Sequence, residues 1–236
     1  MVKNKKMLSK KITFTNLFRN DFFPPKPALK EIPDWYINTP EYVSEHGKKI
    51  TNKLDTPHTI KKCMPVFDAV TSGYILYTQV DVQVNQENGM PNYTWPDQSA
   101  IQFHPIDQAP LHPLKNGAPY PKWVNPYAIS TPPGYSILFT QPFHRESIFT
   151  ILPGIVDTDR YKAPVNFPFV LNDVKWEGLI PAGTPMAQVI PFKRESWEHT
   201  IGSEKELIEQ DKITRKLKTL FFNSYKRQFW NKKEYR

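Results

Sequence analysis

The chain has 236 residues, enough for one large β domain or two small ones that bury a core without disulfides. It holds 24 prolines, which are excluded from helix interiors and central strands, so a helical bundle is disfavoured. Its single cysteine, Cys63, excludes an intramolecular disulfide and fits a reducing compartment. No apolar run of about 18 residues occurs, and the basic start lacks the apolar stretch of a secretion signal.

Charge is distributed unevenly along the chain. Residues 1–30 carry eight basic residues and one acidic residue, and residues 212–236 carry nine basic residues and one acidic residue. The rest of the chain carries 14 basic and 21 acidic residues. Basic ends flanking an acidic body are typical of contact with nucleic acid or an acidic partner, or of solvated tails that aid solubility. The tail residues available for such contact are Lys226, Arg227, Lys232, Lys233 and Arg236.

The first half of the chain predicts an arm, a strap and the start of a β body. Residues 1–20 are expected to be a mobile arm or short helix. Residues 21–45 are rich in proline and aromatics, which indicates a strap packed outside the body through Trp35, Tyr36 and Tyr42, or a proline-rich ligand. Residues 60–70 are interpreted as a strand that buries Cys63. Residues 74–84 alternate as a strand does, and Asn88-Gly89 predicts a hairpin turn.

The second half predicts strands followed by one helix. Residues 91–128 are interpreted as a long ordered loop with short strands. β-Branched and aromatic residues favour strands at 135–142, 147–156, 165–171 and 186–192. Ser203 and Glu206 form a capping-box pattern, and apolar residues at helical spacing predict a helix over about 204–229, docked by Ile213, Leu217, Leu220, Phe221 and Tyr225.

These elements predict a mainly β protein in three parts. Residues 1–45 form the basic arm and strap, residues 46–201 the β-rich body, and residues 202–236 a basic C-terminal helix and tail. The terminal aromatics, interleaved with basic residues, could stack on single-stranded nucleic acid or pack on the body or a neighbouring subunit.

Four segments, in chain order, resemble the superfamily of trimeric dUTPases and dCTP deaminases. They are TSGYILYT (71–78), PPGYSILF (132–139), GIVDTDRY (154–161) and IPAGTPMAQVIPF (180–192). The resemblance implies a β-clip fold, a single compact barrel-like assembly of short strands. It also implies that Asp157 corresponds to the aspartate that orients the attacking water. The nucleotide-binding residues it suggests are Asp157, Arg160, Tyr161, Gln188 and Arg145.

Several departures from the family pattern argue against the same chemistry. Ile75 stands where the family has an aspartate, and PFHRES (142–147) replaces the Pro-Arg-Ser phosphate turn. Arg160 is inserted before Tyr161, and the glycine-rich fifth motif is absent. Because metal and phosphate clamps supply most of the stabilisation in triphosphate hydrolysis, an aspartate alone does not suffice.

The whole chain also resembles uncharacterised proteins of tailed phages of marine cyanobacteria. The resemblance lies in IPDWY (32–36), KKCMPVFDAVTSGY (61–74), GIVDTD (154–159), the segment around IPAGTPMAQVIPFKRESW (180–197) and FWNKKEY (229–235). It implies a viral origin, with the host cytoplasm or the virion as the location.

The resulting hypothesis is a non-enzymatic viral protein on a dUTPase-like scaffold, whose partners are further copies of itself, other viral proteins or, through the tails, nucleic acid. One alternative is a nucleotide-binding or nucleotide-processing enzyme. A second is a metal-dependent oxygenase using His104, Asp107, His112 and His144. Otherwise, His104 and His112 are loop residues that hydrogen-bond to the backbone. No cofactor, metal or catalytic residue is assigned, and the enzyme question stays open.

Overall fold

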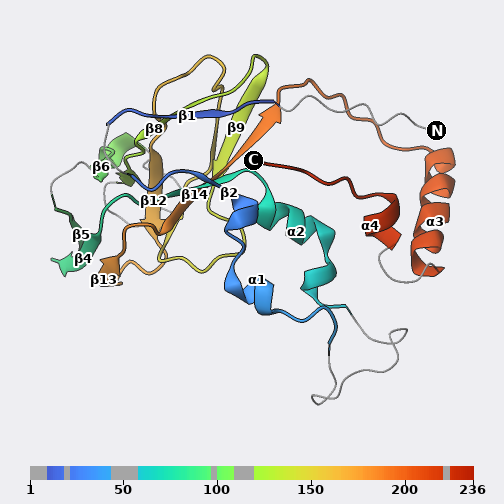
Figure 1. Ribbon diagram of the computed structural model, residues 1–236, viewed down its shortest axis with the longest axis horizontal. Helices are drawn as coiled ribbons and strands as arrows, with labels where there is room; N and C mark the ends of the chain where they lie inside the picture. The colour runs from blue at the N-terminus through green and yellow to red at the C-terminus, as the bar shows by residue number, and fades with distance from the viewer. Residues whose placement is uncertain (1–9, 19–21, 44–57, 97–99, 109–119, 220–223) are drawn as a thin grey trace. The chain divides into compact units, whose positions relative to one another are not determined.

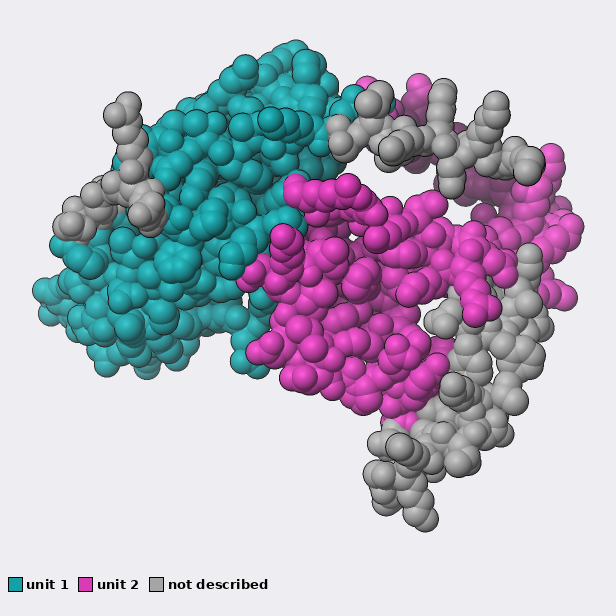
Figure 2. All heavy atoms as spheres, in the orientation of Figure 1, with its two compact units in different colours: residues 1–27, 73–194 teal, residues 28–72, 195–236 magenta. Residues whose placement is uncertain are grey.

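The computed structural model describes residues 10–18, 22–43, 58–96, 100–108, 120–219 and 224–236. The chain divides into two compact units (Figures 1 and 2). Unit 1 comprises residues 1–27 and 73–194, and unit 2 comprises residues 28–72 and 195–236. Among the described residues, unit 1 carries the strands and unit 2 carries the α-helices. The prediction of a mainly β protein is confirmed.

The largest sheet of unit 1 has five antiparallel strands in the order β11-β9-β14-β3-β2. Their bounds are Gly154–Val156 (β11), Tyr135–Thr140 (β9), Pro185–Lys193 (β14), Tyr74–Tyr77 (β3) and Lys26–Pro27 (β2). Each of the four segments that carry the dUTPase resemblance contributes one strand, and the four strands are neighbours. The short β2 lies at an edge, where a proline removes no central ladder bond.

Three smaller antiparallel sheets complete unit 1. One has the order β10-β12-β7-β6, with bounds Phe149–Ile151, Phe167–Leu171, Pro121–Trp123 and Ile101–Phe103. Another has the order β13-β4-β5, with bounds Gly178–Ile180, Val82–Glu87 and Met90–Thr94. The last pairs β1 (Thr13–Asn16) with β8 (Tyr127–Ser130). Within the described residues, none of the four sheets closes into a barrel.

Aromatic rings fill the core of unit 1 between these strands. The rings of Trp123 and Phe169 stack with centroids 4.7 Å apart, and Phe149 packs against both. All three side chains are almost fully buried. Burial of each such side chain contributes about 1.5–3 kcal/mol, so this cluster is a principal source of stability for the β architecture.

Two glycines explain local turns of unit 1. Asn88 and Gly89 both have positive φ, 51° and 76°, as a tight hairpin turn requires, and they join β4 to β5 as predicted. Gly73 has a φ of 71°, and a Cβ at this position would lie 2.1 Å from the carbonyl oxygen of Val189. Only glycine therefore lets β3 begin so close to β14.

Unit 2 is built from short helices. Two 3₁₀ helices, η1 (Ala28–Lys30) and η2 (Ile60–Lys62), accompany α1 (Asp34–Asn38) and α2 (Met64–Thr71), and α3 (Glu204–Thr219) and α4 (Ser224–Gln228) follow after residue 195. Tyr36 is buried and its hydroxyl donates to the Lys61 carbonyl at 3.3 Å. The ring of Phe67 lies 6.4 Å from those of both Tyr36 and Trp230. The C-terminal segment is thus held to α2.

Several local predictions were wrong. Residues 60–71 are helical because Pro65 sits in the first turn of α2, where its missing N–H has no intrahelical partner. Cys63 stands at the N-cap position of this helix, without a capping hydrogen bond from its side chain, and is exposed rather than buried in a strand. The arm at 1–20 contains strand β1, and the single strand expected at 74–84 is divided between β3 and β4, which belong to different sheets.

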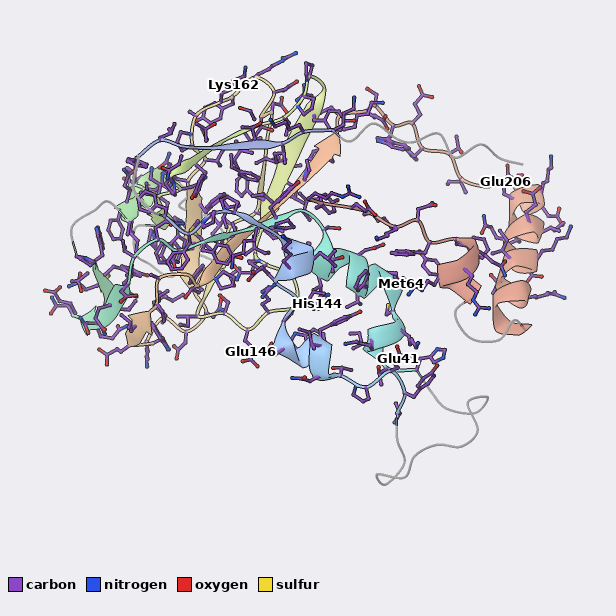
Figure 3. All side chains as sticks on the ribbon, viewed as in Figure 1. Glu41, Met64, His144, Glu146, Lys162 and Glu206 are labelled. Atoms are coloured by element: carbon purple, nitrogen blue, oxygen red, sulfur yellow. The ribbon has the colours of Figure 1, made fainter. Side chains whose placement is uncertain are left out.

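The C-terminal helix begins where it was predicted to begin. Glu206, on the first turn of α3 (Figure 3), accepts the backbone N–H of Ser203 at 2.9 Å and contacts its hydroxyl. Two helices, α3 (Glu204–Thr219) and α4 (Ser224–Gln228), fall within the predicted range of 204–229, and the residues between them lie outside the described part of the chain. Leu207, Ile208 and Ile213 are exposed, so this part of the helix is not docked. Leu220 and Phe221 lie outside the described residues. No helix in the described part of the chain is long and apolar enough to cross a membrane.

Candidate functional site

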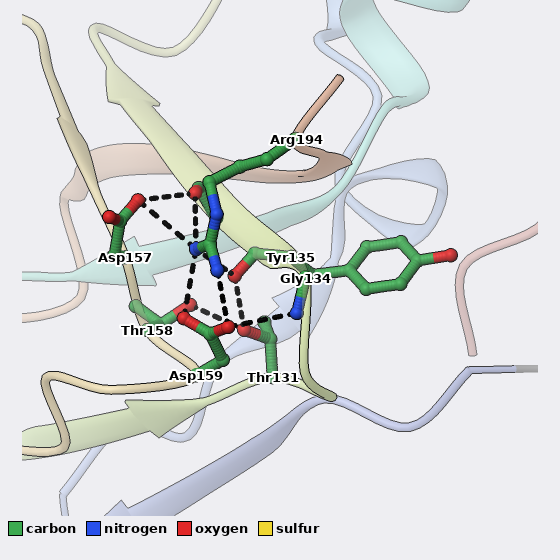
Figure 4. Close-up of polar contacts among 8 residues, drawn as sticks. Thr131, Gly134, Tyr135, Asp157, Thr158, Asp159 and Arg194 are labelled. Atoms are coloured by element: carbon green, nitrogen blue, oxygen red, sulfur yellow. Dashed lines mark hydrogen bonds and ion pairs between the residues drawn. The ribbon is translucent and has the colours of Figure 1, made fainter. Parts of the chain in front are cut away.

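The carboxylate singled out by the dUTPase resemblance lies in a polar cluster at the end of the five-stranded sheet (Figure 4). Asp157 follows β11, and Asp159 lies two residues further on in a tight turn. Arg194 follows β14, and its backbone N–H donates to the Gly134 carbonyl at 2.9 Å. Strand pairing therefore brings the end of β14 beside the start of β9, opposite the turn that carries both aspartates.

Arg194 holds the two carboxylates together. One guanidinium nitrogen donates to Asp159 Oδ1 at 2.8 Å and lies 3.2 Å from Asp157 Oδ1, and the other donates to Asp159 Oδ2. The first nitrogen also donates to the Tyr135 carbonyl at 3.2 Å and to Ser136 Oγ at 3.1 Å. The planar guanidinium of Arg194 therefore binds groups of its own chain, and its contact with Asp159 is bidentate.

Further donors complete the shell around the carboxylates. The Gly134 N–H donates to Asp159 Oδ2 at 2.8 Å, and the Ser136 hydroxyl donates to Asp157 Oδ1 at 2.6 Å. The Ser136 hydrogen bond, together with the Arg194 charge, lowers the pKa of Asp157. The Arg194 and Gly134 hydrogen bonds hold the pKa of Asp159 far below its usual range. Both side chains are therefore carboxylates at neutral pH.

The cluster is suited to stabilising the sheet rather than to acid–base chemistry. Two carboxylates and one guanidinium carry a net charge of −1, which the nearby positive charge of Arg160 opposes. Asp159 is nearly buried, whereas the Asp157 side chain is 51% exposed and carries the water-facing part of this charge. A general base for work near neutral pH needs a raised pKa, and here the Ser136 and Arg194 contacts lower it.

The structure does not gather the predicted nucleotide-binding residues into one site within the chain. Arg160 and Tyr161 are exposed in the turn after Asp157, and their N–H groups donate to its carbonyl. Gln188 is buried on β14, where its side-chain oxygen accepts the Phe143 N–H at 3.0 Å. Gln188 lies opposite Thr140, at the other end of β9 from Ser136. Four strand residues, or about 13 Å, therefore separate it from the Asp157 cluster.

Arg145 and the histidines lie elsewhere. Arg145 is half-buried in the loop that precedes β10. His104 contacts the Gln108 side chain, and His144 is exposed with a φ of 54°. His112 lies outside the described residues. Among the residues described, no group of three or more His, Cys, Asp or Glu is placed to hold a metal ion.

The basic tail is largely paired with acidic groups of its own unit. Lys232 and Arg236 form ion pairs with Glu234 at 3.0 and 2.6 Å, and Lys233 pairs with Asp68 at 2.6 Å. Trp230 donates its indole N–H to both Asp68 oxygens at 3.0 Å. The prediction that tail aromatics pack on the same chain holds for Trp230. Lys226, another of the five predicted phosphate contacts, lies over the Trp230 ring; the hydrogen bond from Lys62 lowers the pKa of Glu41, and the charge of Lys226 helps to lower it.

A small pocket lies among the strands of unit 1. Its volume is about 70 Å³, and its apolar lining includes Phe18, Phe22, Trp123, Pro126 and Met186. The polar side chains in the lining bond to the backbone: Thr78 donates to the Pro181 carbonyl and Gln79 to the Tyr77 carbonyl. An apolar cavity that binds benzene has a volume of about 150 Å³, so this pocket is too small for a nucleotide.

Comparison with models of protein families and with curated proteins finds no match to this chain. Sequence reasoning identified Asp157 but missed Arg194, Asp159 and Ser136. The repeat Asp-Thr-Asp at 157–159 was a visible signal. The partner arginine was not, because its position depends on the pairing of β14 with β9.

Proposed function

We propose that this is a non-enzymatic protein that acts by binding, as an oligomer, on a β scaffold related to the dUTPases. The observation that carries this proposal is that Arg194 and Ser136 bind Asp157 and Asp159 within the chain. The carboxylate that the resemblance assigns to chemistry is thus committed to holding two strands and a turn together. The exposed apolar side chains of unit 2, such as Trp197 at 86% and Ile201 at 97%, support a role in association. By resemblance, the setting is viral.

The test is direct assay for turnover. Purified full-length protein is incubated with dUTP or dCTP and Mg²⁺, and release of diphosphate and ammonia is followed. The matched variant is Asp157→Asn, which keeps the side-chain shape and removes the charge. We expect the protein and the variant to give the same background rate. Turnover by the unaltered protein that the variant loses would overturn the proposal in favour of a nucleotide-processing enzyme.

Binding without turnover is measured separately. A ligand at 100 times its dissociation constant stabilises the folded protein by about 2.7 kcal/mol, which a thermal-shift assay detects. We expect no shift with deoxynucleoside triphosphates, since the Arg194 guanidinium is already bound to Asp157 and Asp159. Metal analysis of the purified protein addresses the oxygenase alternative: stoichiometric iron would support that alternative.

A further inference from the structure

Helix α3 presents a stripe of uncovered side chains along one face. Successive helix residues are rotated by about 100°, so Leu207, Gln210, Ile213 and Thr214 fall within about a third of the circumference. Leu207 is 68% exposed and Ile213 is 37% exposed. Ile208, 51% exposed, lies on nearly the opposite face. A helix with an apolar stripe is normally stabilised by packing that stripe against another surface.

The charges of α3 indicate which surface fits. Residues 204–211 contain four acidic residues and one basic residue, whereas residues 212–219 contain four basic residues and no acidic one. Such a distribution suits the helix dipole. It also makes the helix complementary to itself in one orientation only. Two copies side by side in antiparallel orientation place each acidic half against a basic half, and a parallel pair places like charges together.

We propose that α3 is a self-association surface, on which two copies of the chain pair their helices in antiparallel orientation about a two-fold axis near residue 212. This inference rests on the proposed binding role and names its partner. The symmetry makes the contact isologous, with the Leu207 end of one helix against the C-terminal half of the other. Sixteen residues give a contact about 24 Å long. So short an interface is in the weak class, and dissociation constants in the micromolar range follow.

The first test measures association by sedimentation velocity on the full chain over about 1 to 200 μM. We expect a concentration-dependent dimer that weakens when salt rises from 0.1 M to 1 M, because the Debye length falls from about 10 to 3 Å. Leu207→Lys removes an apolar contact and sets a positive charge against the basic half of the partner. It should weaken the dimer at least tenfold. Ile208→Lys is the matched control and should leave it unchanged. Circular dichroism checks that both variants keep the helix.

The second test measures orientation. A nitroxide label is attached to Lys205→Cys in a Cys63→Ser background, and the distance between labels is measured by pulsed electron paramagnetic resonance. Antiparallel pairing about residue 212 places the labels about 21 Å apart along the axis, whereas parallel pairing leaves them about 10 Å apart. We expect the longer distance. A monomer at every concentration, a dimer indifferent to Leu207→Lys, or the shorter distance would each overturn the inference. Nucleotide turnover would instead overturn the proposed function and would not affect the inference that α3 pairs with its copy.

Discussion

The cluster around Arg194 and the segment from residue 195 to the C-terminus use their charges in opposite ways. In the cluster, groups from β9, β14 and the turn after β11 bond to one another across long stretches of sequence. In the C-terminal segment, ion pairs such as Asp211–Arg215 and Arg236–Glu234 join near neighbours, and apolar side chains stay exposed. The difference teaches that the region where the resemblance predicts chemistry joins distant strands of the sheet, whereas the C-terminal segment keeps apolar side chains exposed, which is why we propose it as the surface for partners.

The largest expected effect comes from the sheet. In Gly73→Ala, the new Cβ would lie 2.1 Å from a backbone oxygen, and the residue would keep a positive φ. Backbone strain alone costs about 1–3 kcal/mol, and the overlap with Val189 adds to it. We expect a loss of roughly 3 kcal/mol or more in the free energy of unfolding, measured by urea denaturation, or loss of soluble protein.

Gly89→Ala is the control for the Gly73 prediction. Gly89 has a similar φ of 76°, and nothing lies within 4 Å of a Cβ placed there. Only the conformational cost of about 1 kcal/mol remains. If the two variants lose equal stability, the close approach of Gly73 to β14 is not what makes this glycine necessary.

A smaller effect is expected at Trp230, a long-range anchor of the C-terminal segment. Trp230→Ala removes the packing on Phe67 and the hydrogen bond to Asp68. Because Trp230 is half-buried, the cost is about 2 kcal/mol rather than that of a core tryptophan. Hydrogen exchange of the α2 amides should speed up by about 30-fold. Trp230→Phe keeps an aromatic ring on Phe67 and loses the hydrogen bond to Asp68, so the exchange rate of the α2 amides is expected to rise about fivefold. Unchanged exchange in both variants would show that the segment is not anchored there.

The smallest effect concerns pH. The folded-state pKa of Asp159 is depressed, so its carboxylate contributes stability above the unfolded value of about 3.9, and that contribution is lost as pH falls towards the folded value. Urea midpoints of the unaltered protein should exceed those of Asp159→Asn by a constant amount between about pH 8 and 5, and the gap should narrow below about pH 4. If the difference in urea midpoint between the two proteins persists at low pH, the contribution of Asp159 to stability does not depend on its charge.

Local signals predicted local structure well. The Asn88-Gly89 hairpin, the strands at 135–140, 167–171 and 185–193, and the capped start of α3 all follow from residues close together in sequence. The strand predicted at residues 60–70 was wrong because a short apolar run fits a buried strand and a short helix equally well, and Pro65 was the signal that decided between them. The order β11-β9-β14-β3 has no local signal, since it depends on pairings between distant segments.

Of the residues in the cluster around Arg194, the sequence predicted only Asp157. Asp157 stood out through a motif, but a motif gives no account of what surrounds it in space. Arg194 lies 35 positions beyond Asp159 and meets it only because β14 runs back along β9. Gln188 was placed in the same predicted site although strand pairing puts it at the far end of β9. The register of a sheet, rather than residue type, determines which of these side chains meet.

The contact between Trp230 and Asp68 has a consequence for synthesis of the chain. The two residues are 162 positions apart. At the usual rate of about 5–20 residues per second, a ribosome needs roughly 8 to 30 s to pass from one to the other. Every strand of unit 1 has been translated before Trp230 appears. The nascent chain therefore carries α2 without its C-terminal cover throughout this interval, and any chain that stops short of Trp230 keeps that face of Phe67 open to water.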